Sequence, residues 1–383
     1  MLFPLNPNTP TCNVFTVLNN ELLHFLEASI QANEFSEMLF SHYQHNGQRC
    51  RSVCWTNSPT REKFRALWNA LPICQQGKQE LYDLINGSQD IQVYFNDLTI
   101  QLPTLGSEDL FEAFKTLTSY LFTDTIKRKS ARDEANSNIH QHFQEYKRVN
   151  SDSQLCYLCG TALLSHDRSG LMDHTQWRGD YDHILCQDKY PIYSIHPGNF
   201  IPTCHICNSK AKGAKDVLRC DAGRRRTAFY PLPPSQESCY QYTSIEPTFR
   251  QLTELHDGEW QDPIAAASIM FTGASVDIAA KINVWKEVYQ VPGRVENHVI
   301  THFCERIASD LMPRDFNDFC NQLTRYAQQI PLDLKKSEWR CWWYRVYESL
   351  TNLDQEQLRD VWSLIEWKLE AADQQNMRDS FGI

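Results

Sequence analysis

Three features of the sequence predict a mainly α-helical protein built from several domains. The chain has 383 residues and is 42% hydrophobic, so it can bury more than one sizeable core. Apolar residues recur at helical spacing toward both ends of the chain. Between these regions lie two Cys-x-x-Cys pairs, Cys156/Cys159 and Cys204/Cys207. We therefore expect a mostly helical domain and linker over residues 1–150, a compact central domain over 151–230 and a helical domain over 231–383.

The N-terminal domain is expected to contain three amphipathic helices. Their apolar stripes fall within residues 22–30, 64–71 and 110–121, and Thr60 is a candidate N-cap for the second. Residues 91–95 alternate in the manner of a strand. None of these elements carries a chemical motif, so the domain has no predicted chemistry.

The connecting segments differ in composition from the helices around them. Residues 127–154 are polar and charged, which indicates a solvated helix or a linker, and residues 230–263 are rich in Pro, Ser and Gln, which indicates an irregular connection. Helical stripes return from Asp277 onward. The aromatic run between Trp339 and Tyr347 is either a binding face or core, and core is the commoner role of aromatic residues at helical spacing.

The charge of the chain is unevenly distributed. The formal net charge of −10 argues against a protein that coats nucleic acid non-specifically, because such affinity comes mainly from neutralised phosphates. Residues 145–230 hold 12 Lys and Arg against 9 Asp and Glu, so this segment is +3 and the remainder is −13. Any contact with phosphate is therefore expected in the middle of the chain.

The cysteines and the N-terminus indicate a reducing, cytoplasmic location. The 14 cysteines are spread through a long chain, and only the two close pairs have metal-ligand spacing. The others are expected to be reduced and mostly buried thiols: Cys12, Cys50, Cys54, Cys74, Cys186, Cys220, Cys239, Cys304, Cys320 and Cys341. The first ten residues lack the basic start of a secretory signal, and no apolar run approaches the length of a membrane span.

The two cysteine pairs predict a closed zinc site. Zn²⁺ prefers thiolate sulfur in tetrahedral geometry, and each Cys-x-x-Cys turn presents two such ligands. Cys156, Cys159, Cys204 and Cys207, with 44 residues between the pairs, supply four. The alternative is a set of ordinary buried thiols.

A polar pair between the two cysteine turns suits hydrolytic chemistry. Asp182 and His183 lie between apolar residues and interrupt a strand-like alternation, so both side chains are expected to have specific roles. A neutral imidazole can accept a proton from water near pH 7, which suits His183 as a general base. The Asp182 carboxylate is a hard ligand for Mg²⁺, and the amide oxygen of Asn208, at the start of a segment that looks helical until Gly213, can be a second ligand.

Together these residues resemble the HNH endonuclease family. The matching pattern is Cys156-x-x-Cys159, Asp182-His183, Asn199-Phe200-Ile201-Pro202 and Cys204-x-x-Cys207-Asn208. The resemblance implies a central ββα-metal fold with a structural zinc on the four cysteines. It also implies that His183 activates water, that Asp182 and Asn208 hold Mg²⁺ or Mn²⁺, and that Asn199 ties the connecting loop so that the histidine points at the scissile phosphate.

Basic residues follow the motif and are expected to bind the nucleic-acid backbone: Lys210, Lys212, Lys215, Arg219, Arg224, Arg225 and Arg226. The alternative for each is a solvated face. Family members often carry a Lys three residues after the last ligand, where this chain has Ala211. The stretch after Cys159 is interpreted as a loop insertion in which His174 or Arg178 is a further candidate contact, whereas His196 and His205 are expected on the surface or in support of the site.

The leading functional hypothesis is a metal-dependent HNH endonuclease that cuts DNA, with flanking helical domains for targeting or partner contacts. Proteins with an HNH segment inside larger helical regions resemble effectors of bacterial anti-phage defence, including nuclease subunits that pair with an ATPase. One alternative is an HNH nuclease that cleaves RNA. Another, from a different class, is a zinc-stabilised nucleic-acid-binding or assembly module without catalysis.

Overall fold

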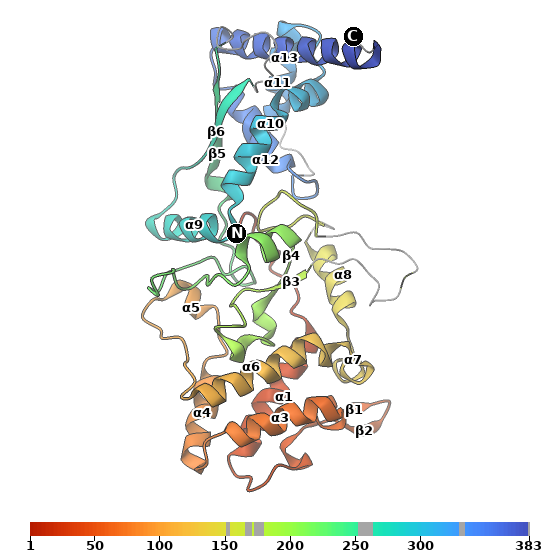
Figure 1. Ribbon diagram of the computed structural model, residues 1–383, viewed down its shortest axis with the longest axis vertical. Helices are drawn as coiled ribbons and strands as arrows, with labels where there is room; N and C mark the ends of the chain where they lie inside the picture. Colours follow the sequence, from red (N-terminus) through yellow and green to blue (C-terminus); the bar gives the residue numbers. More distant parts are fainter. Residues whose placement is uncertain (151–153, 165–170, 172–179, 252–262, 329–333, 382–383) are drawn as a thin grey trace. The chain divides into compact units, whose positions relative to one another are not determined.

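The computed structural model describes all residues except 151–153, 165–170, 172–179, 252–262, 329–333 and 382–383, with side chains described up to residue 370. The chain is mainly helical with small two-stranded sheets (Figure 1). It packs as two compact units, one of Pro4–Gln154 and Leu164–Glu237, and one of Met1–Phe3, Leu155–Leu163 and Ser238–Ile383. This division differs from the three expected domains because short N-terminal and central segments pack with the C-terminal residues.

The unit that begins at Pro4 is built mostly from helices. Its α-helices are α1 (Asn13–Ser29), α2 (Val53–Thr56), α3 (Ser58–Ala70), α4 (Gln75–Gly87), α5 (Val93–Asn96), α6 (Glu108–Thr123), α7 (Lys129–Ala135) and α8 (Ile139–Val149). Its strands form two antiparallel pairs, β1 (His42–His45) with β2 (Gln48–Arg51) and β3 (Asp180–His183) with β4 (Phe200–Thr203). Short 3₁₀ turns lie at Glu37–Leu39, Thr125–Lys127, Pro191–Tyr193 and Pro197–Asn199.

The expected N-terminal helices are confirmed, with one change at a cap. α1 buries an apolar face, and α6 is preceded by the N-cap Ser107, whose side chain accepts a hydrogen bond from Leu110 N. α3 is capped by Asn57 rather than by Thr60, because the Asn57 side chain accepts the hydrogen bond from Thr60 N. Thr60 therefore lies inside the first turn.

Two expectations for this unit are wrong. Residues 91–95 do not form a strand, because Ile91, Tyr94 and Phe95 are the buried positions and this spacing leads into the helical turn α5. The solvation expected for residues 127–154 is also wrong: the segment contains the helices α7 and α8, as one expected alternative had it, but α8 buries Phe143 and Tyr146.

A half-buried acidic group lies in α7, which contacts β1. The Glu134 carboxylate of α7 accepts a hydrogen bond of 2.8 Å from Val53 N. Burial raises the pKa of Glu134 to about 7, and the charge of Glu21 adds to this effect, although the hydrogen bond from Val53 opposes it. This group makes the stability of the unit depend on pH.

The β3–β4 hairpin leads directly into a helical turn. Asp182 pairs with Ile201 and His183 with Phe200, and β4 is buried along its whole length. The turn η6 (Ile206–Lys212) is π-helical and ends at Gly213, whose φ of 49° lies in the left-handed region that favours glycine. The sequence prediction that the chain is helical until Gly213 is confirmed.

The second unit contains a longer hairpin and the C-terminal helices. Its elements are the 3₁₀ turn η7 (Tyr240–Tyr242), β5 (Thr243–Phe249), β6 (Ile264–Phe271), α9 (Val276–Tyr289), α10 (Val291–Leu311), α11 (Phe316–Gln328), α12 (Arg340–Leu350) and α13 (Gln355–Phe381). The helical stripes after Asp277 are confirmed. Residues 243–249 are a strand and not an irregular connection, because Ile245 and its partner Ile269 are buried across the hairpin. Trp342 and Trp343 are 0% and 1% exposed, so the aromatic run is core apart from Trp339, which is half-buried.

Among the described residues, no helix has the length and the apolar character needed to cross a membrane.

Candidate metal centre and neighbouring polar site

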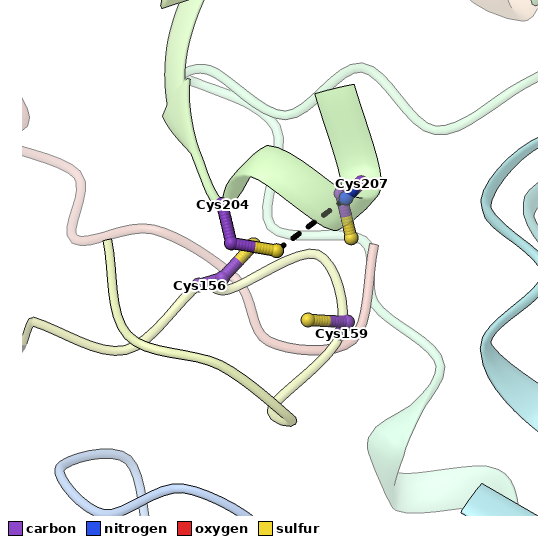
Figure 2. Close-up of side chains that lie close together, drawn as sticks. All are labelled: Cys156, Cys159, Cys204 and Cys207. Atoms are coloured by element: carbon purple, nitrogen blue, oxygen red, sulfur yellow. Dashed lines mark hydrogen bonds between the residues drawn. The ribbon is translucent and has the colours of Figure 1, made fainter. Parts of the chain in front are cut away.

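Four buried cysteines form a cluster that can hold a metal ion such as zinc. The sulfur atoms of Cys156, Cys159, Cys204 and Cys207 all lie within 4.8 Å of one another, and each residue is at most 2% exposed. Figure 2 shows the four side chains pointing toward one another. Four thiols at this spacing match the ligand set of a closed structural zinc site. The expected cluster is confirmed.

The first cysteine turn is fixed by groups that the sequence did not indicate. Gly160 N donates to Cys156 O at 2.9 Å, and Gly160 has a φ of 67° with Cys341 Sγ so close that a Cβ would lie 2.7 Å from it. The Thr161 hydroxyl donates to Cys159 Sγ at 3.2 Å. Trp342 Nε1 donates to Cys159 O at 2.8 Å. A buried aromatic residue of α12 thus also holds a ligand loop.

The Asp182 carboxylate forms a buried ion pair with Lys212. Lys212 Nζ lies 2.8 Å from Asp182 Oδ1, and both side chains are 2% exposed. The same Nζ donates to His183 O at 2.7 Å. Among the described residues, Asp182 Oδ2 is buried and has no hydrogen-bond partner. Burial raises the pKa of Asp182, although Lys212 acts in the opposite direction.

His183 is held in one tautomer beside this pair. Its Nε2 lies 3.1 Å from Ser194 O, and because a carbonyl oxygen can only accept, Nε2 must carry the proton. The unprotonated nitrogen is therefore Nδ1. Burial lowers the pKa of His183 to about 4, so the ring is neutral at pH 7. His183 is only half-buried, which leaves part of the side chain accessible.

The N-terminal helices support His183 through an aromatic stack. The Phe200 ring of β4 lies 3.8 Å from the Phe15 ring of α1 and 5.4 Å from the Phe122 ring of α6. Phe122 also packs edge-on against His183 with a centroid distance of 4.4 Å. Sequence reasoning assigned no role to these helices at the site, and no local signal marks Phe122, because the contact is made only by tertiary packing.

Asn199 closes the loop between the two strands. It is fully buried, its Nδ2 donates to Leu185 O at 3.1 Å and to Tyr193 O at 2.9 Å, and its Oδ1 accepts from Leu185 N at 2.7 Å. Tyr193 precedes Ser194, the residue that fixes the His183 ring. Asn199 therefore positions the carbonyl group that sets the tautomer of His183.

Asn208 is half-buried, and within the described part of the chain its side chain has no hydrogen bond. Its backbone carbonyl accepts from Gly213 N at 2.8 Å. The structure thus joins Asp182 and His183 through Lys212, whereas no described contact joins the Asn208 side chain to either residue.

The predicted basic surface is smaller than the sequence suggested. Lys212 is buried in its ion pair and does not share an exposed face with Asn208, which corrects its assignment as a phosphate contact. Arg225 donates to Leu218 O and Tyr94 O, and Arg226 donates to Asp216 O at 2.6 Å. These guanidinium groups are half-buried and bond backbone carbonyls of the chain.

The remaining basic residues are accessible to different degrees. Lys210 and Arg224 are exposed, whereas Lys215 and Arg219 are half-buried. Arg219 donates to Gly223 O at 3.0 Å. Lys210 and Arg224 are therefore the strongest candidates for contact with a phosphate backbone.

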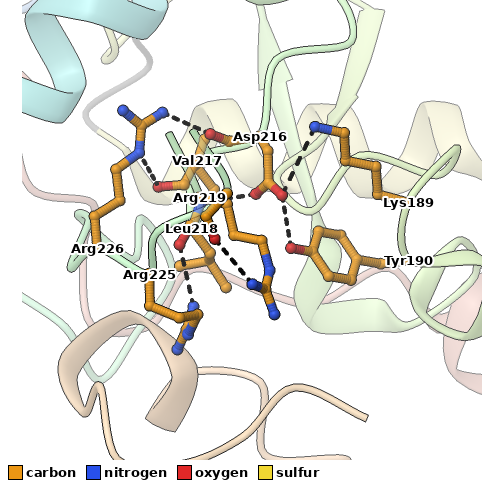
Figure 3. A network of polar contacts seen from close by, with 9 residues as sticks. Lys189, Tyr190, Asp216, Val217, Leu218, Arg219, Arg225 and Arg226 are labelled. Carbon is orange, nitrogen blue, oxygen red and sulfur yellow. Dashed lines mark hydrogen bonds and ion pairs between the residues drawn. The ribbon is translucent and has the colours of Figure 1, made fainter. Parts of the chain in front are cut away.

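A buried carboxylate organises the loop that carries these residues (Figure 3). Asp216 is 4% exposed, and it accepts hydrogen bonds from Tyr190 Oη at 2.7 Å and Leu218 N at 2.8 Å. Lys189 Nζ lies 3.9 Å from the same carboxylate. The charge of Asp216 therefore has a structural role, because its carboxylate holds this loop in place.

Two lone histidines behave as expected. His196 is buried, and its Nδ1 accepts a hydrogen bond from Gly198 N within the loop that Asn199 closes. His205 is exposed, with Nδ1 3.8 Å from the Asp180 carboxylate. His174 and Arg178 lie outside the described residues.

No family model, curated protein or solved structure matches the chain. The chemistry of the site rests on its own residues. They provide a buried thiol cluster, a neutral imidazole with a defined tautomer, and a buried carboxylate with one oxygen that no described residue hydrogen-bonds.

Proposed function

We propose that the protein is a metal-dependent HNH endonuclease that hydrolyses DNA phosphodiester bonds. The observation that carries this proposal is the arrangement around His183. The ring lies at the end of β3 with its tautomer set by Ser194 O, Asp182 precedes it, and a second strand and a short helix follow. This strand, loop, strand and helix order supports the ββα-metal fold that the HNH resemblance implies.

The tautomer of His183 suits a general base. Because Nε2–H is committed to Ser194 O, the lone pair on Nδ1 is available to accept a proton from a water molecule. Phe122 and Phe200 limit the orientations of the ring, and Asn199 holds the loop that carries Ser194. These residues position the base and take no part in proton transfer.

The state of the Asp182 carboxylate supports the binding of a hard divalent ion. Asp182 Oδ2 is buried and has no hydrogen-bond partner in the part of the chain that the structure describes, which is unfavourable for a carboxylate oxygen unless a cation or a donor contacts it. Asp182 and the Asn208 amide oxygen would hold Mg²⁺ or Mn²⁺. When bound, the ion would supply positive charge against the phosphoryl and leaving oxygens. The four cysteines would hold a structural zinc.

The uneven charge favours a localised contact with the polymer. Lys210 and Arg224 provide exposed positive charge in the segment after the motif, whereas the chain as a whole is acidic. The helical regions are then available for targeting or for a protein partner. We place the nuclease in bacterial anti-phage defence, with an ATPase as the partner, on the architectural resemblance alone.

A non-catalytic function is the second candidate because Lys212 already neutralises Asp182. In that case the cysteine cluster would stabilise a nucleic-acid-binding or assembly module, and the ion pair would be permanent. An HNH nuclease that cleaves RNA is the other alternative, since the same groups suit either polymer.

Cleavage assays with a matched pair of histidine variants test the proposal. Purified protein is incubated with plasmid DNA, or with RNA, in Mg²⁺ or Mn²⁺. His183→Ala should reduce DNA cleavage at least about 10²-fold while zinc content and DNA binding persist. His205→Ala, with a side chain that is 65% exposed, should leave the rate unchanged. Near-normal cleavage by folded His183→Ala protein contradicts the mechanism, and binding without cleavage of either polymer favours the module.

A further inference from the structure

We propose that Lys212 is the resident cation of the Asp182 site and is displaced when a divalent ion binds. The inference rests on the proposed function, and it gives Lys212 a role distinct from the phosphate contact expected from the sequence. Lys212 would hold the nuclease in a metal-free resting state. Its release would accompany the formation of the metal site.

Lys212 places its positive charge directly beside Asp182, the carboxylate that would bind the divalent ion. The ammonium group touches Asp182 Oδ1 and His183 O, at 2.8 and 2.7 Å, and thus joins the proposed metal ligand to the backbone of the proposed base. Both side chains of the ion pair are 2% exposed. The pair is therefore shielded from water and from salt.

The charge balance at Asp182 favours replacement of the Lys212 ammonium group by the divalent ion over the presence of both cations at once. Among the described residues, Asp182 is the only carboxylate paired with Lys212, and the ammonium group already neutralises it. Placing a divalent ion on the same carboxylate would bring two cations together in a buried site, where their repulsion is weakly screened. Asn208 is uncharged and cannot offset this repulsion. The ion and the ammonium group should therefore compete.

The local backbone allows Lys212 to leave without disturbing the hairpin. Lys212 is the last residue of η6, and the π-helical turn ends immediately after it. Gly213 follows in a left-handed conformation, and an added Cβ there would meet only Ser209 O, at 3.8 Å. Gly213 and Ala214 are exposed. A change at this end of η6 would expose the ammonium group to solvent.

Amine labelling of the wild-type protein tests the displacement directly. In the zinc-loaded protein without other divalent ions, Lys212 should react with an acylating reagent far more slowly than Lys210, which is exposed on the same turn. Saturating Mn²⁺ should raise the labelling of Lys212 at least about tenfold and leave that of Lys210 unchanged, as read by mass spectrometry of peptides. Mn²⁺ binding that leaves Lys212 protected overturns the proposal. This experiment needs no variant and so avoids any loss of folding.

Mn²⁺ affinity separates this inference from the proposed function. Titrations followed by electron paramagnetic resonance compare wild type with Lys212→Met, Lys210→Met and Asp182→Asn. Removing the competing ammonium should lower the dissociation constant of Mn²⁺ at least about tenfold. Lys210→Met should not change it, and Asp182→Asn should abolish site binding. Unchanged or weaker binding by folded Lys212→Met protein overturns the inference alone, whereas Mn²⁺ binding that does not depend on Asp182 overturns both the metal site and the inference.

Discussion

Replacement of Asn199 by Ala tests how the loop behind His183 is held. The substitution removes three hydrogen bonds of 2.7 to 3.1 Å and leaves Leu185 N, Leu185 O and Tyr193 O to find other partners in a site where Asn199 is 0% exposed. A net hydrogen bond contributes about 1 kcal/mol, and an unsatisfied buried polar group costs about 1 to 3 kcal/mol. We expect a total loss of about 3 to 4 kcal/mol in the free energy of unfolding.

The assay is urea denaturation of the zinc-loaded protein without other divalent ions. Asn208→Ala is the matched control, because that side chain is half-buried and has no hydrogen bond in the described part of the chain. It should change stability by no more than about 0.5 kcal/mol. Asn199→Asp should be as harmful as Asn199→Ala, since a carboxylate cannot donate to Leu185 O or Tyr193 O. Equal stability of Asn199→Ala and Asn208→Ala would refute the reasoning.

The same variant separates positioning from binding. Tyr193 O accepts from Asn199, and the next carbonyl, Ser194 O, fixes the His183 ring. Under the proposed function, loosening this loop should lower the cleavage rate of folded protein more than it lowers DNA affinity. Loss of affinity with an unchanged cleavage rate would show that the loop acts on the substrate and not on the base.

Three further outcomes are expected. Cys204→Ser should release zinc, measured by elemental analysis, and lower the stability of the segment around the cysteines; undiminished zinc content would contradict the site. Lys210→Gln combined with Arg224→Gln should weaken DNA binding and flatten its dependence on salt by about two units of slope, whereas Arg226→Gln should mainly reduce stability because its guanidinium bonds Asp216 O. Glu134 has a folded-state pKa raised from 4.5 to about 7, so its contribution to stability is fully present below pH 4.5 and is lost as the pH rises to about 7. Glu134→Gln should therefore gain up to about 3 kcal/mol relative to wild type between pH 5 and pH 8, and an equal difference at both pH values would show that the carboxyl group is not protonated in the fold.

The local parts of the site could be predicted from the sequence because their signals are local. Cys-x-x-Cys turns carry their ligand geometry within four residues, and the four sulfur atoms do converge. The Asp182-His183 pair interrupts strand alternation and does lie on a strand. The apolar stripe of α6 was also sufficient to predict that helix, because the N-cap Ser107 and the buried face are both local to one element.

The features that sequence reasoning missed depend on packing between segments that are distant in the sequence. The β5–β6 hairpin was missed because β5 begins within a stretch rich in Pro, Ser and Gln, and because the pairing is not encoded in either strand alone. Trp342 supports a cysteine turn 183 residues away in the sequence. Phe122 reaches His183 from a helix that has no motif of its own. Such contacts are decided by how elements pack, which spacing along the chain does not report.

The two lysines of η6 show where spacing itself misleads. On an ideal α-helix, Lys212 lies four residues after Asn208 and shares its face, so both would point toward the substrate. In the structure the turn is π-helical, and Lys212 is buried against Asp182 while Lys210 stays exposed. The buried Asp182 carboxylate gives a physical reason for that choice, because an unpaired charge in this position would be strongly unfavourable. The role of a basic residue beside a carboxylate is therefore decided by the charge it must balance, and the exchange of Lys212 for a divalent ion follows from the same requirement.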